Sequence, residues 1–474
     1  MVLNSQIFVF LFLPLVFILN TAVMLFKKPL AVRISNGLLL AASLVFYAWG
    51  DPVMILVLVT EALFGYVIAL LAERASGRTK KLWLVLGAII CIGTLCFYKY
   101  TSFLLSIFGI HYAPIDNMAL PLGISFYTFN LLSYIVDVYK GKVRANKNFA
   151  RVLLFVAFFP RLTAGPIMKY DMFYEKMESR VFDVKETAEG VRRFIIGLAK
   201  KLFIANTVAL VVDNVFALAG SSLKGAAAWV GAICYMFQIY FDFSGYSDMA
   251  IGVGHMFGFD TCENFNYPYT ALTVKDFWRR WHISVSTWFR DYLYIPLGGN
   301  RKGKFRTSLN KIIVFFFTGL WHGANFTFII WGLWHGFFLL IEEYVGPFFK
   351  GKKYLKPLGY VYTMLVVCLG FVMFRADNVM QGFRYIGTMF TSWGGFSAVS
   401  SALGGTLNVY TLFIIMISFI AMLPVSKWLS ALGKKAGCEQ TFEVLSYVYV
   451  AALFAISLLA LASSTYNPFI YIKF

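Results

Sequence analysis

The chain has 474 residues, of which 59% are hydrophobic and only 14% are charged. A soluble domain carries about 25% charged residues, so a soluble fold could not cover this much apolar surface, whereas lipid can solvate it. The net charge of +19 does not indicate nucleic-acid binding, because the basic residues fall between apolar stretches and form no soluble face. We therefore predict an all-α, polytopic integral membrane protein with about a dozen embedded helices.

Apolar stretches long enough to cross a bilayer recur along the chain. The clear candidates are residues 6–26, 34–50, 52–72, 82–98, 309–343, 357–375, 407–424 and 443–463. Further stretches, interrupted by Gly, Pro and polar residues, are 114–139, 149–168, 188–217 and 226–259. Such interruptions are tolerated where the chain is buried in protein or lines a cavity. We expect one domain over 1–474, with a motif-bearing core at about 114–356 and scaffold helices at about 1–113 and 357–474.

Lys and Arg clusters predict the orientation, because short basic loops are retained in the cytoplasm. If the cluster from Lys27 to Arg33 is cytoplasmic, the N-terminus lies outside. The next two spans then return the cluster from Arg74 to Lys81 to the cytoplasm, which is self-consistent. The first span lacks a basic start, so we interpret it as a retained helix and not as a cleavable signal peptide. The six cysteines show no zinc-like spacing, and no metal site is predicted.

A polar constellation occurs in the apolar run 235–250, YMFQIYFDFSGYSDMA. Asp242, Ser244 and Asp248 punctuate it. Buried carboxylates could shuttle protons or shape a channel. They could equally hydrogen-bond helix termini, and the residues alone favour that structural interpretation.

Residues 274–292, VKDFWRRWHISVSTWFRDY, have an apolar stripe at helical spacing and cations on the other side. This pattern predicts an amphipathic helix that lies at an interface or lines a polar funnel. His282 falls at the boundary, beside Trp278 and Phe289. A histidine there is suited to proton transfer, although the spacing alone favours an interfacial histidine held by a backbone carbonyl.

The next segment, PLGGNRKGKFR at 296–306, carries four cations in a Gly-rich loop. They are Arg301, Lys302, Lys304 and Arg306. The loop is not a Walker motif. It could bind the phosphates of a nucleotide-bearing donor such as coenzyme A, but simple retention of basic loops in the cytoplasm is the favoured explanation.

An ionisable residue occurs in the strongly apolar run 317–336, FTGLWHGANFTFIIWGLWHG. His322 is flanked by Trp321, and Asn325 is expected one turn on, on the same helix face. Because burial of such a residue in a membrane is costly, a functional role is favoured over a purely structural one. Gly319 and Gly323 would allow close approach of a neighbouring helix. The second histidine of the run, His335, falls about 140° away on one continuous helix, so the two are not expected to act together.

These segments resemble the membrane-bound O-acyltransferase family, and more closely its alginate and peptidoglycan O-acetyltransferase membrane subunits. The most specific resemblance is in ENFNYPYTALTVKDFWRRWHISVSTWFRDYLYIPLGGNR (263–301) and GLWHGANFTFIIWGLWHG (319–336). Supporting segments are PLGISFYTFNLLSYIVDVYKG (121–141), FFPRLTAGPI (158–167), YFDFSGYSDMAIGVGHMFGF (240–259) and NPFIYIKF (467–474). In FFPRLTAGPI, Arg161 and Thr163 depart from the alginate-type pattern, which weakens alginate as the specific acceptor.

The resemblance implies a helical bundle around a funnel or tunnel, with His322 as the catalytic residue and His282 assisting it. Further residues of the tunnel would be Asn325, Trp278, Trp321, Asp242 and Ser244. The implied donor is acetyl-CoA, with no permanently bound cofactor. The implied setting is the bacterial cytoplasmic membrane, with a separate extracytoplasmic SGNH-hydrolase-like partner and a polysaccharide acceptor.

Three alternatives remain open from the sequence. The same family includes D-alanyl transfer to teichoic acid, in which the donor is an acyl carrier protein. A transporter could use intramembrane Asp242 and Asp248, but we find no inverted repeat of the kind such transporters often show. A non-catalytic scaffold for a partner is the third.

Overall fold

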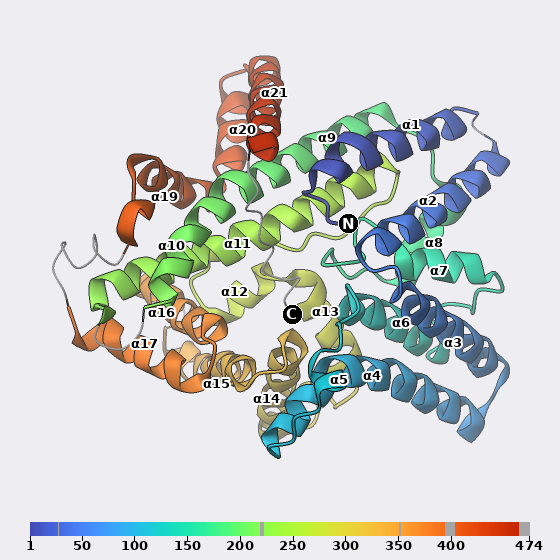
Figure 1. Cartoon of the computed structure of the whole chain (residues 1–474), viewed down its shortest axis with the longest axis horizontal. Helices are drawn as coiled ribbons and strands as arrows, with labels where there is room; N and C mark the ends of the chain where they lie inside the picture. The colour runs from blue at the N-terminus through green and yellow to red at the C-terminus, as the bar shows by residue number, and fades with distance from the viewer. Residues whose placement is uncertain (27, 219–221, 350–351, 394–402, 464–474) are drawn as a thin grey trace. The chain divides into compact units, whose positions relative to one another are not determined.

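The computed structural model describes residues 1–26, 28–218, 222–349, 352–393 and 403–463, and all regular secondary structure within these ranges is helical (Figure 1). The chain divides into two compact units, and the division passes through helices α9 (Val184–Ala199) and α11 (Gly225–Met256). The first unit holds residues 1–194 and 246–263, and the second holds 195–245 and 264–474. The terminal segment 467–474, which contributes to the family resemblance, lies outside the described residues. The single domain expected over 1–474 remains a prediction.

Eight helices within the described ranges are long and apolar enough to cross a membrane, or nine if the bent pair α19–α20 is one span. They comprise α2, α3, α4, the continuous run Val184–Phe216, α11, α15, α16 and α21. The expected all-α membrane architecture is confirmed. The expected dozen embedded segments remain a prediction, because several apolar stretches form shorter helices. The first, Phe8–Met24, is one of these.

The first unit is built mainly from the N-terminal helices. Its elements are η1 (Phe8–Phe12), α1 (Leu13–Met24), α2 (Pro29–Gly50), α3 (Ile55–Arg74), α4 (Gly77–Ile107), α5 (Ala113–Asp116), α6 (Ile124–Tyr139), α7 (Phe149–Ala157), α8 (Tyr170–Ser179) and parts of α9 and α11. An aromatic cluster ties η1 to α2 and to the segment after α7, with Phe12 and Phe159 in edge contact at 5.3 Å between ring centroids. Such pairs stabilise beyond the area they bury.

The second unit contains both histidine motifs. Its elements are η2 (Lys200–Ala205), α10 (Asn206–Phe216), η4 (Pro268–Thr270), α12 (Val274–Arg280), α13 (Ile283–Phe289), η5 (Arg290–Tyr294), α14 (Gly303–His322), α15 (Phe326–Phe349), η6 (Lys353–Leu355), α16 (Lys356–Arg375), α17 (Val379–Thr391), η7 (Gly404–Thr406), α19 (Val409–Ala421), α20 (Val425–Lys435), α21 (Glu439–Ser463) and parts of α9 and α11. Helix α12 packs against α15 and α16 (Figure 1). Its Trp281 ring lies 5.4 Å from that of Phe277 and 5.2 Å from that of Phe371 on α16.

The run predicted as one span at 309–343 is instead a helical hairpin. Helix α14 ends at His322 and α15 begins at Phe326. The two helices touch backbone to backbone, because a Cβ added to Gly319 would lie 2.3 Å from the carbonyl oxygen of Phe328. The expected close approach at Gly319 is therefore confirmed. Periodicity missed the break, since the apolar pattern continues through it.

The amphipathic helix predicted at 274–292 is also broken. Helix α12 ends at Arg280, and His282 takes a left-handed conformation with φ of 44° before α13 begins. Such a φ is uncommon for a residue with a side chain. Backbone hydrogen bonds hold the break, from Asn266 to the carbonyl of Arg280 and from Ile283 to the carbonyl of Asn264. The extended segment before η4 therefore fixes where His282 points.

Candidate functional site

His322 is the last residue of α14 and is buried at the turn into α15, with 2% of its surface exposed. Its ring lies 5.0 Å from the ring of Trp331 on α15 and 5.3 Å from that of Phe374 on α16. Both neighbours meet it at close to right angles. An ionisable group in such an apolar setting is costly, which favours a functional role over a packing role.

His282 is buried, with 1% of its surface exposed. Its ring contacts Phe243 and Trp321 at centroid distances of 4.6 and 5.9 Å, and the sequence analysis expected neither neighbour. The reason is the left-handed break, which turns the side chain away from the helix face that a continuous helix would give it. Burial lowers the pKa of His282 to about 3, so its ring is neutral at neutral pH.

Asn264 holds His282 in one orientation and was missed by the sequence analysis. Its Oδ1 lies 3.1 Å from Nδ1 of His282 and also accepts from the hydroxyl of Ser284 at 2.9 Å and from that residue's backbone N–H. Because an amide oxygen only accepts, Nδ1 of the neutral ring carries the hydrogen and Nε2 is an acceptor. The expected backbone-carbonyl partner is thus replaced by a side chain.

The two histidines converge. The ring centroids of His282 and His322 lie 6.3 Å apart. Trp321 completes this group, with its ring 5.0 Å from that of His322. The geometry of these rings thus supports the predicted pairing.

A cavity of about 590 Å³ lies among α12, α13, α14 and α15. Its walls include Trp278 and Phe315, whose rings are 5.0 Å apart, and Thr318, one helical turn before His322. Four cations also line it, namely Lys275, Arg279, Arg290 and Lys311. This volume is typical of small-molecule sites. The cavity therefore combines apolar walls with cations. One of its lining residues, Thr318, is four residues before His322 in the sequence.

The predicted donor-binding loop does not line this cavity. Residues Arg301, Lys302 and Lys304 are exposed at the start of α14, and Arg306 is half-buried there. The cavity cations come instead from α12, η5 and α14. Three of them, Lys275, Arg279 and Arg290, belong to the 274–292 segment, so its charge pattern was the available signal.

Three further expected residues have other roles in the structure. Asn325 is not on the face of His322 but in the break after it, where its side chain bonds Thr327 N–H and the carbonyl of Asp377. Asp242 forms a buried ion pair with Lys201, at 2.7 Å. Ser244 is buried, two residues along the same helix.

Asp248, the other carboxylate of that run, has a different partner. Within the first unit it accepts from Arg193 at 3.0 Å, and Arg193 also binds Glu263. Each of the two carboxylates thus has an ion-pair partner of its own within its unit.

The residues that depart from the alginate-type pattern are also buried in the first unit. The Arg161 guanidinium lies 4.6 Å from the ring centroid of Phe155 and 4.5 Å from that of Phe173. Thr163 shares a hydrogen bond with Tyr246. Such cation–π contacts stabilise a buried guanidinium. These contacts explain the two residues by packing.

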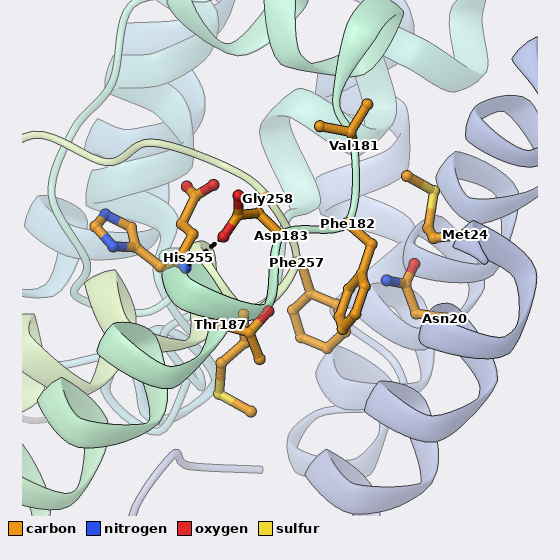
Figure 2. Close-up of a pocket in the computed structure, with 11 residues that line it drawn as sticks. Asn20, Met24, Val181, Phe182, Asp183, Thr187, His255, Phe257 and Gly258 are labelled. Carbon is orange, nitrogen blue, oxygen red and sulfur yellow. Dashed lines mark hydrogen bonds between the residues drawn. The ribbon is translucent and has the colours of Figure 1, made fainter. Parts of the chain in front are cut away.

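A second, small cavity belongs to the first unit, and His255 and Asp183 are among the residues that line it (Figure 2). Its volume of about 10 Å³ is near the minimum for one water molecule. Figure 2 shows the His255 ring on the far side from Asn20 and Met24, both of which line the same space. This cavity is too small for an acyl donor.

The chain is similar to known proteins over most of its length. The model of the membrane-bound O-acyltransferase family matches residues 143–380, which include both histidines. A probable alginate O-acetylase of Pseudomonas putida is 39% identical over the whole of both chains. A peptidoglycan O-acetyltransferase of Helicobacter pylori is 36% identical over 81% of this chain and 78% of its own length. A teichoic acid D-alanyltransferase of Bacillus subtilis is 31% identical over 56% of this chain and 70% of its own length.

Proposed function

Because this chain belongs to the membrane-bound O-acyltransferase family and is a multi-pass membrane acyltransferase, we propose that it moves an acetyl group from cytoplasmic acetyl-CoA to an extracytoplasmic polysaccharide. The family match and the named relatives confirm the family and the acyltransferase activity expected from the sequence. The donor, the acceptor and the direction of transfer are parts of the proposal.

The convergence of His282 and His322 carries this proposal. Two imidazoles with ring centroids 6.3 Å apart lie in apolar surroundings, where dipoles act more strongly than in water. The described residues offer no cluster of three or more His, Cys, Asp or Glu that could hold a metal ion. The pair can supply the base of an acyl transfer.

In the proposed reaction, His322 takes the proton of the acceptor hydroxyl as its oxygen attacks the thioester carbonyl carbon. A C–O bond forms, the C–S bond breaks, and the departing thiolate takes the proton from His322. General-base assistance of this kind contributes about 10²–10⁴-fold. Neutral His282 accepts through Nε2, so it fits the orientation of a hydroxyl or the relay of a proton better than polarisation of the carbonyl.

The cavity of about 590 Å³ supports a donor route to this pair. Its apolar walls suit the arm that carries the thioester, and exposed Lys275 and Arg279 at α12 suit the donor's phosphates. Acetyl-CoA is a substrate in this proposal, and no resident cofactor is invoked.

We place the chain in the bacterial cytoplasmic membrane with its N-terminus outside, following the basic loops. The family resemblance implies an SGNH-hydrolase-like partner, which is proposed to complete delivery to the polysaccharide. Labelling of Gly77→Cys from outside intact cells would contradict this orientation.

Transfer of D-alanine from a carrier protein is the second candidate function. The likeness to a teichoic acid D-alanyltransferase supports it, but that likeness covers 56% of this chain, whereas the alginate-type relative matches all of it. The acetyl reaction is therefore preferred.

The test uses membrane vesicles that contain the full chain together with its polymer-making and partner proteins. Vesicles receive either radiolabelled acetyl-CoA or a carrier protein loaded with radiolabelled D-alanine, and label in the polymer is counted. We expect label from acetyl-CoA that disappears in His322→Ala. Label from the D-alanyl carrier alone would support the second candidate, and label from neither would contradict acyl transfer.

A further inference from the structure

Three buried rings near His322 carry ring nitrogens without a hydrogen-bond partner among the described residues. They are the indole nitrogens of Trp278 and Trp331 and both imidazole nitrogens of His335. Trp331 is 1% exposed and His335 is fully buried. A buried polar group without a partner costs about 1–3 kcal/mol, so most such groups in proteins are satisfied. Three together in one place call for an explanation by function.

Other indoles of the same unit do find partners. Trp334 on α15 donates to the carbonyl of Val366 at 2.9 Å, and Trp229 on α11 donates to that of Met389 at the same distance. The fold is thus able to satisfy an indole N–H. Among the indoles of the described residues, the buried nitrogens without a partner are those of Trp278 and Trp331.

These three rings form one contiguous group. The ring centroid of Trp278 lies 5.6 Å from that of Trp331 and 5.2 Å from that of His335, and the latter two are 5.2 Å apart. Trp331 and His335 are one turn apart on α15. The hairpin break thus corrects the expectation that His335 and His322 lie apart on one helix, because both rings contact Trp331.

The same group joins the cavity to His322. Trp278 lines the cavity of about 590 Å³, and the Trp331 ring lies 5.0 Å from that of His322. Edge contacts between aromatic rings stabilise an N–H only weakly, and they offer nothing to the acceptor nitrogen of a neutral imidazole. Ring contacts thus run from the cavity wall at Trp278 through Trp331 to the proposed base.

We propose that the indole N–H groups of Trp331 and Trp278, with His335 beside them, bind the carbonyl oxygen of the acyl thioester and its oxyanion. This inference rests on the proposed function. When the acceptor oxygen bonds to the carbonyl carbon, the carbonyl π electrons move onto this oxygen, and His322 holds the proton that the hydroxyl loses. When the C–S bond breaks, the electrons return, the carbonyl re-forms, and the thiolate takes that proton.

Neutral donors suit this place. A Lys or Arg would carry a charge that is costly to bury in an apolar bundle, whereas an indole N–H adds a dipole without net charge. A fixed dipole in water-excluded surroundings stabilises charge as it develops. The group would therefore act mainly in the transition state, not in binding of the donor.

The test replaces Trp331 by Phe, and in a second variant by benzothienylalanine, which keeps the shape of indole but has sulfur in place of N–H. Transfer of label from acetyl-CoA is measured in the vesicles described above, together with the thermal midpoint of each purified variant. We expect kcat to fall about 10²–10³-fold in both variants, with the donor KM changed less than about threefold. Trp278→Phe should show the same pattern.

Trp334→Phe is the matched control, because it removes an indole N–H that already has a backbone partner. It should lower the thermal midpoint and leave kcat unchanged. If the benzothienylalanine variant at Trp331 keeps more than about a third of the wild-type kcat, the proposed oxyanion site is wrong. If the wild-type vesicles transfer no label from acetyl-CoA, the proposed function itself fails, so the two failures are distinguishable.

Discussion

Lys201 and Asp242 form an ion pair in the second unit, with Nζ and Oδ1 2.7 Å apart and only 2% of each side chain exposed. Lys201 lies in the π-helical segment η2 and Asp242 lies on α11. Each charge compensates the other where solvent is excluded. The pair thus links two helical segments of this unit.

Removal of one member of this pair should destabilise the protein more than removal of both. Lys201→Met leaves a buried carboxylate and is expected to cost about 3–5 kcal/mol, whereas the double variant with Asp242→Leu should recover most of that loss. Thermal unfolding of the purified protein measures both. As a control, Lys176→Met breaks an exposed pair with Asp260 and should cost at most about 1 kcal/mol. A stable Lys201→Met variant would contradict the buried-pair interpretation.

His322→Gln should abolish acetylation while the protein inserts at normal abundance. Glutamine keeps hydrogen-bonding capacity and similar bulk but does not accept a proton at neutral pH. Loss of a general base costs about 10²–10⁴-fold. Polymer acetylation and membrane abundance are measured together. Retention of more than about a tenth of wild-type activity would mean that another group, first of all His335, accepts the proton.

Asn264→Ala should lower kcat through His282. Loss of the bond to Nδ1 frees the imidazole to change tautomer, and a hydrogen bond worth about 1.4 kcal/mol corresponds to roughly a tenfold change in rate. Because Asn264 acts through His282, the double variant with His282→Ala should be no slower than His282→Ala alone. Ser284→Ala is the control, since it removes another bond to the same oxygen without touching His282. Additive losses in the double variant would show that Asn264 acts elsewhere.

Gly319→Ala should separate the two helices of the hairpin. Its new Cβ would lie 2.3 Å from the carbonyl oxygen of Phe328, a contact that only a backbone shift relieves. We expect a lower thermal midpoint and reduced activity, because His322 lies one turn further along α14. Gly93→Ala on α4 is the control, since no atom lies within 4 Å of the added Cβ there. Equal thermal midpoints for the two variants would show that the hairpin is less tightly packed than the structure has it.

The cavity cations and the loop cations are alternative binding sites for the donor's phosphates, and the donor KM of variants distinguishes them. If the cavity cations bind the donor, Arg279→Ala should raise the donor KM several-fold and leave kcat nearly unchanged, the pattern of lost ground-state binding. The combined variant Arg301→Ala, Lys302→Ala and Lys304→Ala should then leave the KM near wild type. The reverse result would restore the exposed loop as the donor site.

The sequence by itself determined the class of the protein. Long apolar stretches with few charges are stable in lipid. A segment in lipid must have its backbone groups hydrogen-bonded, and a helix does this within the segment. It also singled out His322, because a histidine in an apolar, Trp-rich segment is costly, and the family resemblance implied a role for His282 beside it. Composition and local pattern are enough for these conclusions, since they depend on what single segments are made of.

The tertiary structure alone decided how these residues meet. Hydrophobic periodicity continues through His282 and through the break after His322, so the sequence predicted two unbroken helices. In the structure the chain turns at both places. The first turn is held by the bond from the Ile283 N–H to the Asn264 carbonyl, and the second brings Gly319 against Phe328. Because of those two turns, the ring centroids of His282 and His322 lie 6.3 Å apart, and His335 and His322 both contact the indole of Trp331. Lys201 could reach Asp242 only through packing of separate helices. Such contacts depend on the path of the chain through space, which local spacing does not encode.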